Sequence, residues 1–222
     1  MSNSSETNPQ ELAKRLDSLL EALREERYDA RADDSGLGED DQSILDRVNQ
    51  TVDAMASKIA LYEQILDAIP FPASVTDMDM NWLFLNKAAM SVTGLDRKEM
   101  RGKPCCNWGA DICNTERCGI QMLRKGETTS YFQQPGMDMD FQVDAQYILD
   151  ESGSRVGHIE LVQDITTANR VREFQTREVE RLATNLTQFS AGQLDIDTSV
   201  TKGDEHTAET RKAFITIQEG LD

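Results

Sequence analysis

The spacing of the apolar residues changes twice along this chain of 222 residues. From residue 44 to residue 69 they recur at alternating steps of three and four, which predicts a helix with one apolar seam. Pro70 and Pro72 stop this pattern, and apolar then alternates with polar, as in half-buried strands. After residue 166 the helical spacing returns. We therefore predict an α+β domain between two helical segments. The first seam consists of Ile44, Val48, Val52, Met55, Ile59, Tyr62, Leu66 and Ile69.

The central region predicts a five-stranded antiparallel sheet with short helices. Residues 72–89 read as two strands around an acidic turn, followed by a helix, with Trp82 and Phe84 on one face. In the clearest strand, Phe141 and Val143 alternate with polar residues, so one face is buried and the other is wet. The three later strands are expected at 128–133, 137–149 and 156–165.

Helical segments precede and follow this sheet. In the second segment Val179, Leu182, Leu186 and Phe189 form a seam, and Gly192 interrupts it before a last helix. Parallel coiled coils need a second chain, so we expect a homodimer. The predicted boundaries are a disordered tail at 1–10, a helical segment at 11–61, the sheet domain at 62–166 and a second helical segment at 167–222.

The chain is strongly acidic, with 40 acidic residues, 23 basic residues and a net charge of −17. Such a surface repels phosphate backbones and anionic headgroups, so we expect no nucleic-acid partner. No apolar run approaches the roughly 20 residues that cross a bilayer, and the first ten residues do not resemble a signal peptide. We expect a cytoplasmic location and no membrane span in this chain. A chain that forms the cytosolic portion of a membrane receptor also fits this expectation.

The order of strand, turn, strand, short helices and three strands, closed by "VQDIT", resembles a PAS sensor domain over residues 62–166. The most specific segments are "ILDAIPFPASVTDMDMNWLFLNKAA" and Asp164-Ile165-Thr166. In PAS proteins this triad stands where the last strand passes its signal to an output helix. Thr166 or Thr167 is the expected cap of that helix. The resemblance implies a concave interior that holds a ligand.

The flanking segments resemble HAMP relay modules. Gly192-Gln193-Leu194 matches a glycine-x-apolar connector, and Gly203-Asp204-Glu205 matches the acidic start of the second HAMP helix. The first flank is a poorer match, with Val48-Asn49 at an apolar-Asn position. The whole order looks most like the cytoplasmic part of a bacterial methyl-accepting chemotaxis protein, whose kinase and adaptor bind a region without a counterpart here. The candidate relay residues are Asp164, Ile165, Thr166, Gly192, Leu194 and Glu205.

All four cysteines lie in one segment, "GKPCCNWGADICNTERCGI". The spacing is not the C-x2-C pair of a zinc knuckle, and adjacent side chains rarely converge on one ion. Cys105, Cys113 and Cys118 are therefore better ligand candidates than Cys106. Three interpretations stay open: an iron–sulfur cluster or a zinc ion, a reversible disulfide between Cys113 and Cys118, and plain packing in a core.

The cofactors known from PAS domains are disfavoured. His158 is expected on the surface, opposite Ile159 and Leu161, and His206 lies in the second flank, so neither suits a haem. The C-x-x-C-H haem motif and the flavin-photoreceptor signature Asn-Cys-Arg-Phe-Leu-Gln are absent from the sequence. The cofactor stays unknown. Side chains that either line a ligand pocket or form plain core are Trp82, Phe84, Trp108, Tyr131 and Phe141.

The sequence shows no grouping of serine, histidine and acid, and no phosphate-binding loop, so we expect no enzyme. The first hypothesis is a sensor and relay module of the chemotaxis-receptor type. A ligand or cysteine chemistry shifts the sheet, the signal leaves through residues 164–166, and the coiled coil changes its packing. The alternatives are a dimerisation scaffold that senses nothing and the sensor portion of a histidine kinase.

Overall fold

The computed structural model describes residues 9–134, 136–193 and 197–220. Its contacts divide the chain into two units, Met1–Ile69 and Pro70–Asp222, and each is described by itself. The predicted tail at 1–10 falls mostly on residues 1–8, which lie outside the described residues, and a helix already begins at Pro9. None of the described helices is both long enough and apolar enough to span a membrane.

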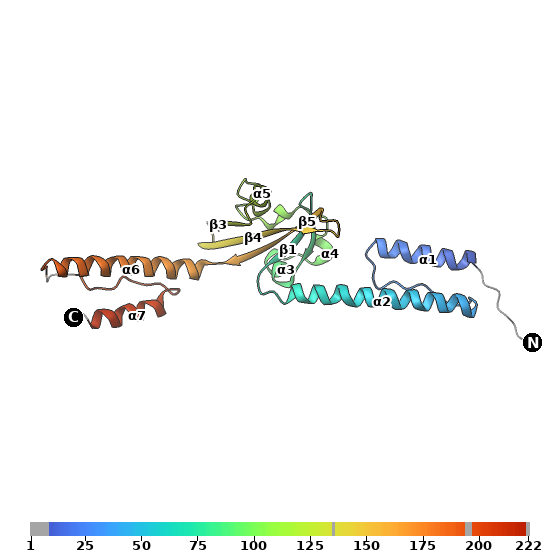
Figure 1. Ribbon diagram of the computed structural model, residues 1–222, viewed down its shortest axis with the longest axis horizontal. Helices are drawn as coiled ribbons and strands as arrows, with labels where there is room; N and C mark the ends of the chain where they lie inside the picture. The colour runs from blue at the N-terminus through green and yellow to red at the C-terminus, as the bar shows by residue number, and fades with distance from the viewer. Residues whose placement is uncertain (1–8, 135, 194–196, 221–222) are drawn as a thin grey trace, which may run out of the picture. The chain divides into compact units, whose positions relative to one another are not determined.

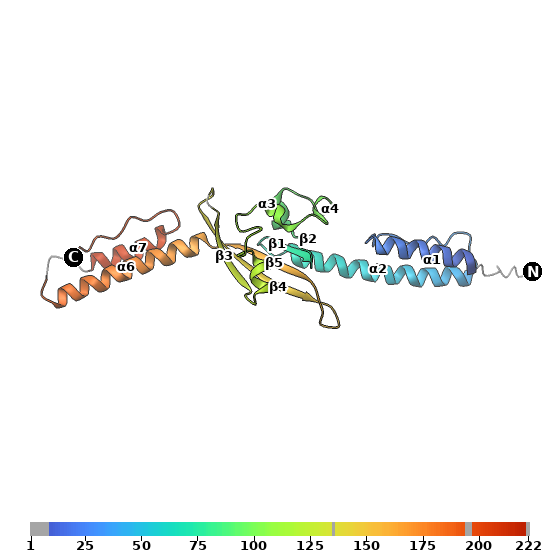
Figure 2. The ribbon, with the colours of Figure 1, turned by 90° about the horizontal axis from the view of Figure 1, so that it is seen from above.

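The first unit contains two helices, α1 (Pro9–Arg24) and α2 (Glu39–Asp67), joined by an extended connector. Arg15 donates a hydrogen bond from Nη1 to the carbonyl of Asp33 at 2.5 Å. The Asn49 side chain accepts from the backbone N–H of Ala32 and donates to its carbonyl, both at 2.9 Å. The connector therefore runs back along both helices, and α1 and α2 lie side by side and parallel (Figures 1 and 2).

The apolar seam of α2 is only partly covered by α1. Val52 is buried and Val48 is half-buried in a small core, which also contains Leu45. Leu45 is fully buried although it lies outside the predicted seam. Met55 and Tyr62, two members of that seam, are exposed. The predicted helix is therefore present, but the core between α1 and α2 contains only part of the predicted seam and adds Leu45 to it.

The second unit contains a five-stranded sheet in the order β2-β1-β5-β4-β3, in which every neighbouring pair of the described strands is antiparallel. The helix α5 packs against β3, β4 and β5, and α3 contacts β1 and β2 (Figures 1 and 2). This arrangement confirms the predicted α+β fold. The elements are β1 (Ala73–Asp77), β2 (Trp82–Leu85), α3 (Lys87–Thr93), α4 (Arg97–Met100), the 3₁₀ helix η1 (Cys105–Trp108), α5 (Gly119–Arg124), β3 (Thr129–Gln134), β4 (Met139–Leu149) and β5 (Arg155–Asp164).

The first hairpin departs from simple alternation. The register between β1 and β2 shifts between Val75 and Thr76. Trp82 and Leu85 are consequently both fully buried, while Leu83 between them is exposed. Phe84, which was expected on the same face as Trp82, is half-buried and packs against the core that contains Trp82, and the register irregularity adds Leu85 to the buried residues of this short strand.

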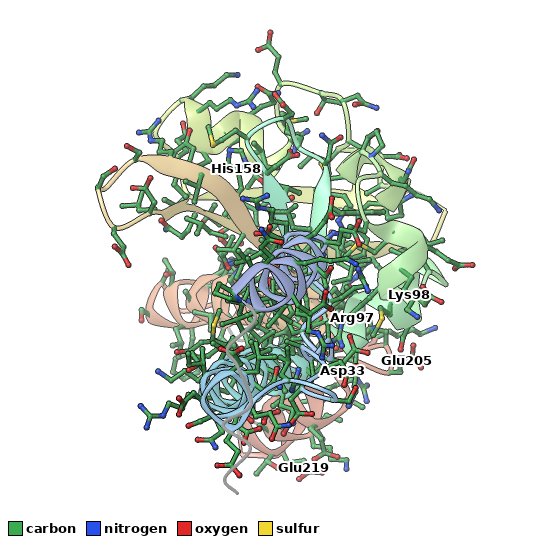
Figure 3. All side chains as sticks on the ribbon, turned by 90° about the vertical axis from the view of Figure 1, so that its right-hand side faces the viewer. Asp33, Arg97, Lys98, His158, Glu205 and Glu219 are labelled. Atoms are coloured by element: carbon green, nitrogen blue, oxygen red, sulfur yellow. The ribbon has the colours of Figure 1, made fainter. Side chains whose placement is uncertain are left out.

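The last strand, β5, turns polar residues toward the covered face of the sheet. His158 is fully buried and Glu160 is 7% exposed, whereas Ile159 and Leu161 are only half-buried. The Nδ1 atom of His158 lies 3.2 Å from the Thr76 hydroxyl oxygen, and Figure 3 places His158 among the strands. The surface position expected for His158 was therefore wrong. The predicted alternation along β5 is present, but the polar set is buried and the apolar set is the more exposed one.

The second unit continues with α6 (Thr166–Ser190) and α7 (Ala208–Glu219). The rings of Phe174 and Phe214 meet edge to face at 6.0 Å, and the Thr167 hydroxyl lies 2.9 Å from Nδ1 of His206. The start of α7 therefore lies beside the first half of α6, and the two helices run parallel (Figures 1 and 2). The buried carboxylate of Glu178 accepts from Arg181 at 2.8 Å and from the Thr201 hydroxyl, which ties the connector to α6.

Candidate functional site

A cavity of about 470 Å³ lies between the sheet and the segment that contains η1 and α5. Such a volume lies in the range of small-molecule sites. Its wall is mostly apolar and sulfur-containing, with Phe71, Trp108, Phe132 and Phe141 as aromatic members and Glu160 and Asp164 as acids. The other lining residues are Pro70, Pro72, Val92, Cys105, Gly109, Ala110, Ile112, Cys113, Cys118, Gly119, Gln134, Met137, Met139, Val143 and Val162.

Two of the five aromatic residues proposed from the sequence, Trp108 and Phe141, line this cavity. Trp82 instead lies in the core behind it, with its ring 6.0 Å from that of Trp108 in an edge contact. Phe84 packs against the same core and carries the guanidinium of Arg97 at 4.5 Å from its ring. Tyr131 is 55% exposed and borders a separate surface hollow of about 670 Å³. Trp82, Phe84 and Tyr131 therefore do not line this cavity, and Trp82 and Phe84 belong to the plain core that the sequence offered as the alternative.

The cysteine segment forms one wall of the cavity. Cys105, Cys113 and Cys118 line it and Cys106 does not, and all four are free thiols. Burial raises the pKa of the first three thiols, that of Cys105 to about 12, and the nearby Glu160 raises them further. Thiolate is the form that attacks disulfides and binds metals, so these thiols have low reactivity near neutral pH.

The described residues do not form a set of metal ligands in this conformation. Within the described ranges, no three His, Cys, Asp or Glu side chains are arranged so that they could hold a metal ion. Neither His158 nor His206 is among the described residues that line the cavity. In this conformation Cys105, Cys113 and Cys118 are uncharged wall residues, and the reversible disulfide between Cys113 and Cys118 stays a prediction.

Glu160 is the polar residue of the cavity that the sequence reasoning missed. No described residue donates a hydrogen bond to its carboxylate, and burial raises its pKa to about 7. Its Oε1 atom lies close to the backbone of α5, since a Cβ added at Gly119 would stand 2.6 Å from it. The sequence did contain a signal, because Glu160 has the same strand parity as Val162 and stands opposite Ala145 of β4.

Comparison with known proteins identifies the central fold. Residues 66–170 match the family model of the PAS fold. These residues form a PAS domain. The prediction of a PAS domain is thereby confirmed, and most of α1, α2, α6 and α7 lies outside the match. No curated protein is similar enough to match this chain.

Solved PAS structures are similar to this region at low identity. A sensory box sensor histidine kinase from Vibrio cholerae is 21% identical with a TM-score of 0.37, and the match covers 52% of this chain and 98% of that one. The PAS domain of BvgS from Bordetella pertussis is 18% identical with a TM-score of 0.40, covering 58% and 98%. The PAS domain of an HTR-like protein from Haloarcula marismortui is 17% identical with a TM-score of 0.36, covering 50% and 99%.

The exit of the PAS domain is built around Asp164. Its Oδ1 atom accepts hydrogen bonds from the backbone N–H of Thr166 at 2.9 Å and from the Thr166 hydroxyl at 2.5 Å. The Thr166 hydroxyl in turn accepts from the backbone N–H of Asp140 at 2.9 Å, and the N–H of Ile165 donates to the Asp140 carbonyl at 2.9 Å. Asp164, rather than Thr166 or Thr167, therefore satisfies a free N–H at the start of α6.

The remaining relay candidates lie beyond the PAS domain. Gly192 follows the end of α6 with a φ of 84°, a conformation that suits glycine, and its N–H donates to the carbonyl of Phe189. Leu194 lies outside the described residues. Glu205 is exposed (Figure 3). The helix α7 begins only at Ala208, after a turn in which Asp204 and Thr207 exchange hydrogen bonds.

Proposed function

We propose that this chain is a non-enzymatic sensor and relay module in which the PAS cavity receives a stimulus and α6 carries the response. The observation that supports it most is the double role of Asp164. Asp164 is one of the residues that line the cavity, and its carboxylate accepts hydrogen bonds from Thr166, the first residue of α6. A ligand that moves or pairs with this carboxylate changes the anchoring of α6 in the same step.

The response needs a partner helix, and the exposed face of α6 suggests a second copy of the chain. Val179, Leu186 and Phe189 are 56%, 58% and 56% exposed, whereas Phe174 and Asn185 face the connector and α7. An apolar stripe at steps of three and four in water favours coiled-coil pairing. The proposed assembly is a parallel homodimer in which α6 packs against α6 of the partner.

The flanks are proposed to act as HAMP-like relays. In each of them two parallel helices are joined by an extended connector that hydrogen bonds back to a helix, through Asn49 in the first and Glu178 in the second. Such pairs can switch between two discrete packings when one helix rotates. The proposed location is the cytoplasm, as for the receptor portions that this order of segments resembles.

The output is proposed to be of the chemotaxis-receptor type, acting on a downstream kinase and adaptor, with a sensor histidine kinase as the alternative. Fusing residues 1–222 to a chemoreceptor signalling hairpin, and separately to a histidine-kinase core, separates the two. Stimulus-dependent phosphorylation in the first fusion alone supports the chemotaxis output, and in the second alone it supports the kinase.

The test of the sensor proposal is photo-cross-linking between subunits. A photoreactive residue is placed at Leu186 and, separately, at Phe189, both on the exposed face of α6. A sensor changes the yields at these two positions when the cavity is occupied. A scaffold gives yields that stay the same with and without a cavity ligand, and a monomer gives no cross-link at either position.

A further inference from the structure

The charged residues in the cavity wall all have the same sign. Glu160 and Asp164 are acidic, and no described lining residue is basic. Asp164 is already engaged by Thr166, whereas the carboxylate of Glu160 receives no hydrogen bond from a described residue. The chain as a whole carries a net charge of −17. Both the acids in the wall and the net negative charge of the chain would repel an anionic ligand and attract a cation.

The surroundings of Glu160 leave this carboxylate without compensation. Ser74 of β1 and Ala145 of β4 stand opposite it in the sheet, and Cys105, Cys113 and Cys118 approach it from the other wall. None of these groups is positively charged. Buried polar groups normally have a partner, and an unpaired buried carboxylate is costly. Because Glu160 lines the cavity, a bound ligand with a hydrogen-bond donor would supply the partner that its carboxylate lacks.

The aromatic side chains of the wall suit the same kind of guest. Phe132 and Phe141 stack with their ring centres 5.1 Å apart, and Trp108 belongs to the opposite wall. Ring faces attract organic cations, and they also cover the apolar part of such a molecule. The volume of about 470 Å³ admits a molecule with one or two rings.

We propose that the PAS cavity binds a small organic cation, an ammonium group on an apolar body, with Glu160 as its counter-ion. This assignment rests on the proposed role of the cavity as the sensor's input and names the class of its ligand. A neutral apolar guest would leave Glu160 unpaired, and a bare metal ion finds no group of three donors among the described residues. An organic ammonium supplies both the charge and the hydrogen bonds that the site lacks.

The titration of Glu160 gives this binding a pH dependence. Burial raises the pKa of Glu160 to about 7, and a bound cation favours the ionised form. The groups that face it are the three thiols, and their raised pKa values keep them neutral at pH 8 and below. An alkylammonium stays protonated over this range, since a lysine ammonium has a pKa of about 10.4. The affinity is therefore expected to rise about tenfold between pH 6 and pH 8.

The experiment uses three probes with one apolar body and different charges: 2-phenylethylammonium, 2-phenylethanol and phenylacetate. Binding of each to the full chain is measured by calorimetry at pH 8. The ammonium is expected to bind more tightly than the alcohol, and phenylacetate is expected not to bind. Glu160→Gln is expected to weaken the ammonium at least about tenfold and to remove the pH dependence. The exposed Glu151→Gln is the matched control and is expected to bind like the parent chain.

Three results would overturn the assignment: equal ammonium binding by Glu160→Gln and the parent, binding of phenylacetate as tight as that of the ammonium, or no ammonium binding at millimolar concentration. Circular dichroism confirms that each variant is folded. The failure of the sensor proposal has a different signature. If the ammonium binds through Glu160 but the α6 cross-links do not change, the ligand class stands and the sensing role falls. If the alcohol alone binds and changes the cross-links, the sensing role stands and the assigned ligand class falls.

Discussion

The carboxylate of Asp164 accepts a hydrogen bond of 2.5 Å from the hydroxyl of Thr166, and the same hydroxyl accepts one of 2.9 Å from the backbone of Asp140. Asp164 and Thr166 thus connect the end of β5, the start of β4 and the first turn of α6. Because Asp164 also lines the cavity, these hydrogen bonds connect the cavity directly to the helix that leaves the domain.

Thr166→Val should break this path. The substitution keeps the shape of the side chain but removes the hydroxyl, which leaves the Asp140 N–H without its acceptor. We expect a loss of about 1–3 kcal/mol in the free energy of unfolding, measured by urea denaturation. Thr176→Val on the same helix is the control, because its hydroxyl donates only to the carbonyl of Arg172. Equal stability of the two variants would show that the Thr166 hydroxyl contributes nothing.

Glu160 should make the unliganded protein less stable as the pH rises. Its pKa is about 7 in the folded chain and about 4.5 in the unfolded chain, so the folded state keeps the proton longer. Folding therefore becomes less favourable between pH 4.5 and pH 7, by about 3 kcal/mol in total. His158, whose pKa burial lowers, changes stability in the opposite direction below its usual value of 6.5.

The Glu160 contribution is isolated by comparing the parent with Glu160→Gln in urea at pH 5.5 and pH 8. The parent should lose more stability over this interval than the variant does, since His158 is common to both. Parallel changes in the two proteins would mean that Glu160 is ionised in the folded chain already at pH 5.5.

Gly119→Ala should disturb the wall of the cavity. The new Cβ would stand 2.6 Å from Oε1 of Glu160 and 2.8 Å from Cγ1 of Val143. Alanine favours a helix over glycine by up to about 1 kcal/mol, but the overpacking costs about 1–3 kcal/mol, so we expect a net loss. Gly136→Ala, where nothing lies within 4 Å, should leave the thermal midpoint nearly unchanged. A more stable Gly119→Ala protein would argue against the close contact.

Asn49→Ala should loosen the first helical unit. The variant loses both hydrogen bonds between the Asn49 amide and the backbone of Ala32, so we expect a loss of about 1–2 kcal/mol. Faster amide exchange at Ala32 is the local measurement. Gln50→Ala, at the exposed neighbouring position, is the control because it also replaces an amide side chain of α2 by alanine. The same exchange rate at Ala32 in both variants would contradict the bonding seen here.

The sequence predicted the architecture because period-two alternation is strong in β4 and the proline pair marks the end of α2 clearly. It did not predict the inner face of β5. Alternation separates His158 and Glu160 from Ile159 and Leu161, but it does not tell which set is buried. That choice depends on the segment that covers the sheet, which lies about forty residues earlier in the chain.

The sequence indicated the side of the domain on which the cavity lies, but it did not decide which aromatic side chains line that cavity. Cys105, Cys113, Cys118 and Phe141 lie at the cavity wall, and they belong to elements with a clear position in the fold. Trp82 lies in the core, the other position that the sequence left open, next to the register shift of the first hairpin. Tyr131 is exposed, whereas its neighbour Phe132 lines the cavity.

The most direct test of the account is amide hydrogen exchange at residues 165–170 with the cavity empty and with it saturated by 2-phenylethylammonium. A cation bound at Glu160, in the cavity that Asp164 also lines, should change the exchange of the Thr166 N–H, which donates to Asp164, and of the turn that follows. A clear change is expected in the parent chain, and a smaller change is expected in Glu160→Gln, because less of the variant is occupied at the same ammonium concentration. Unchanged exchange in a saturated parent chain would contradict the proposed connection between the cavity and α6.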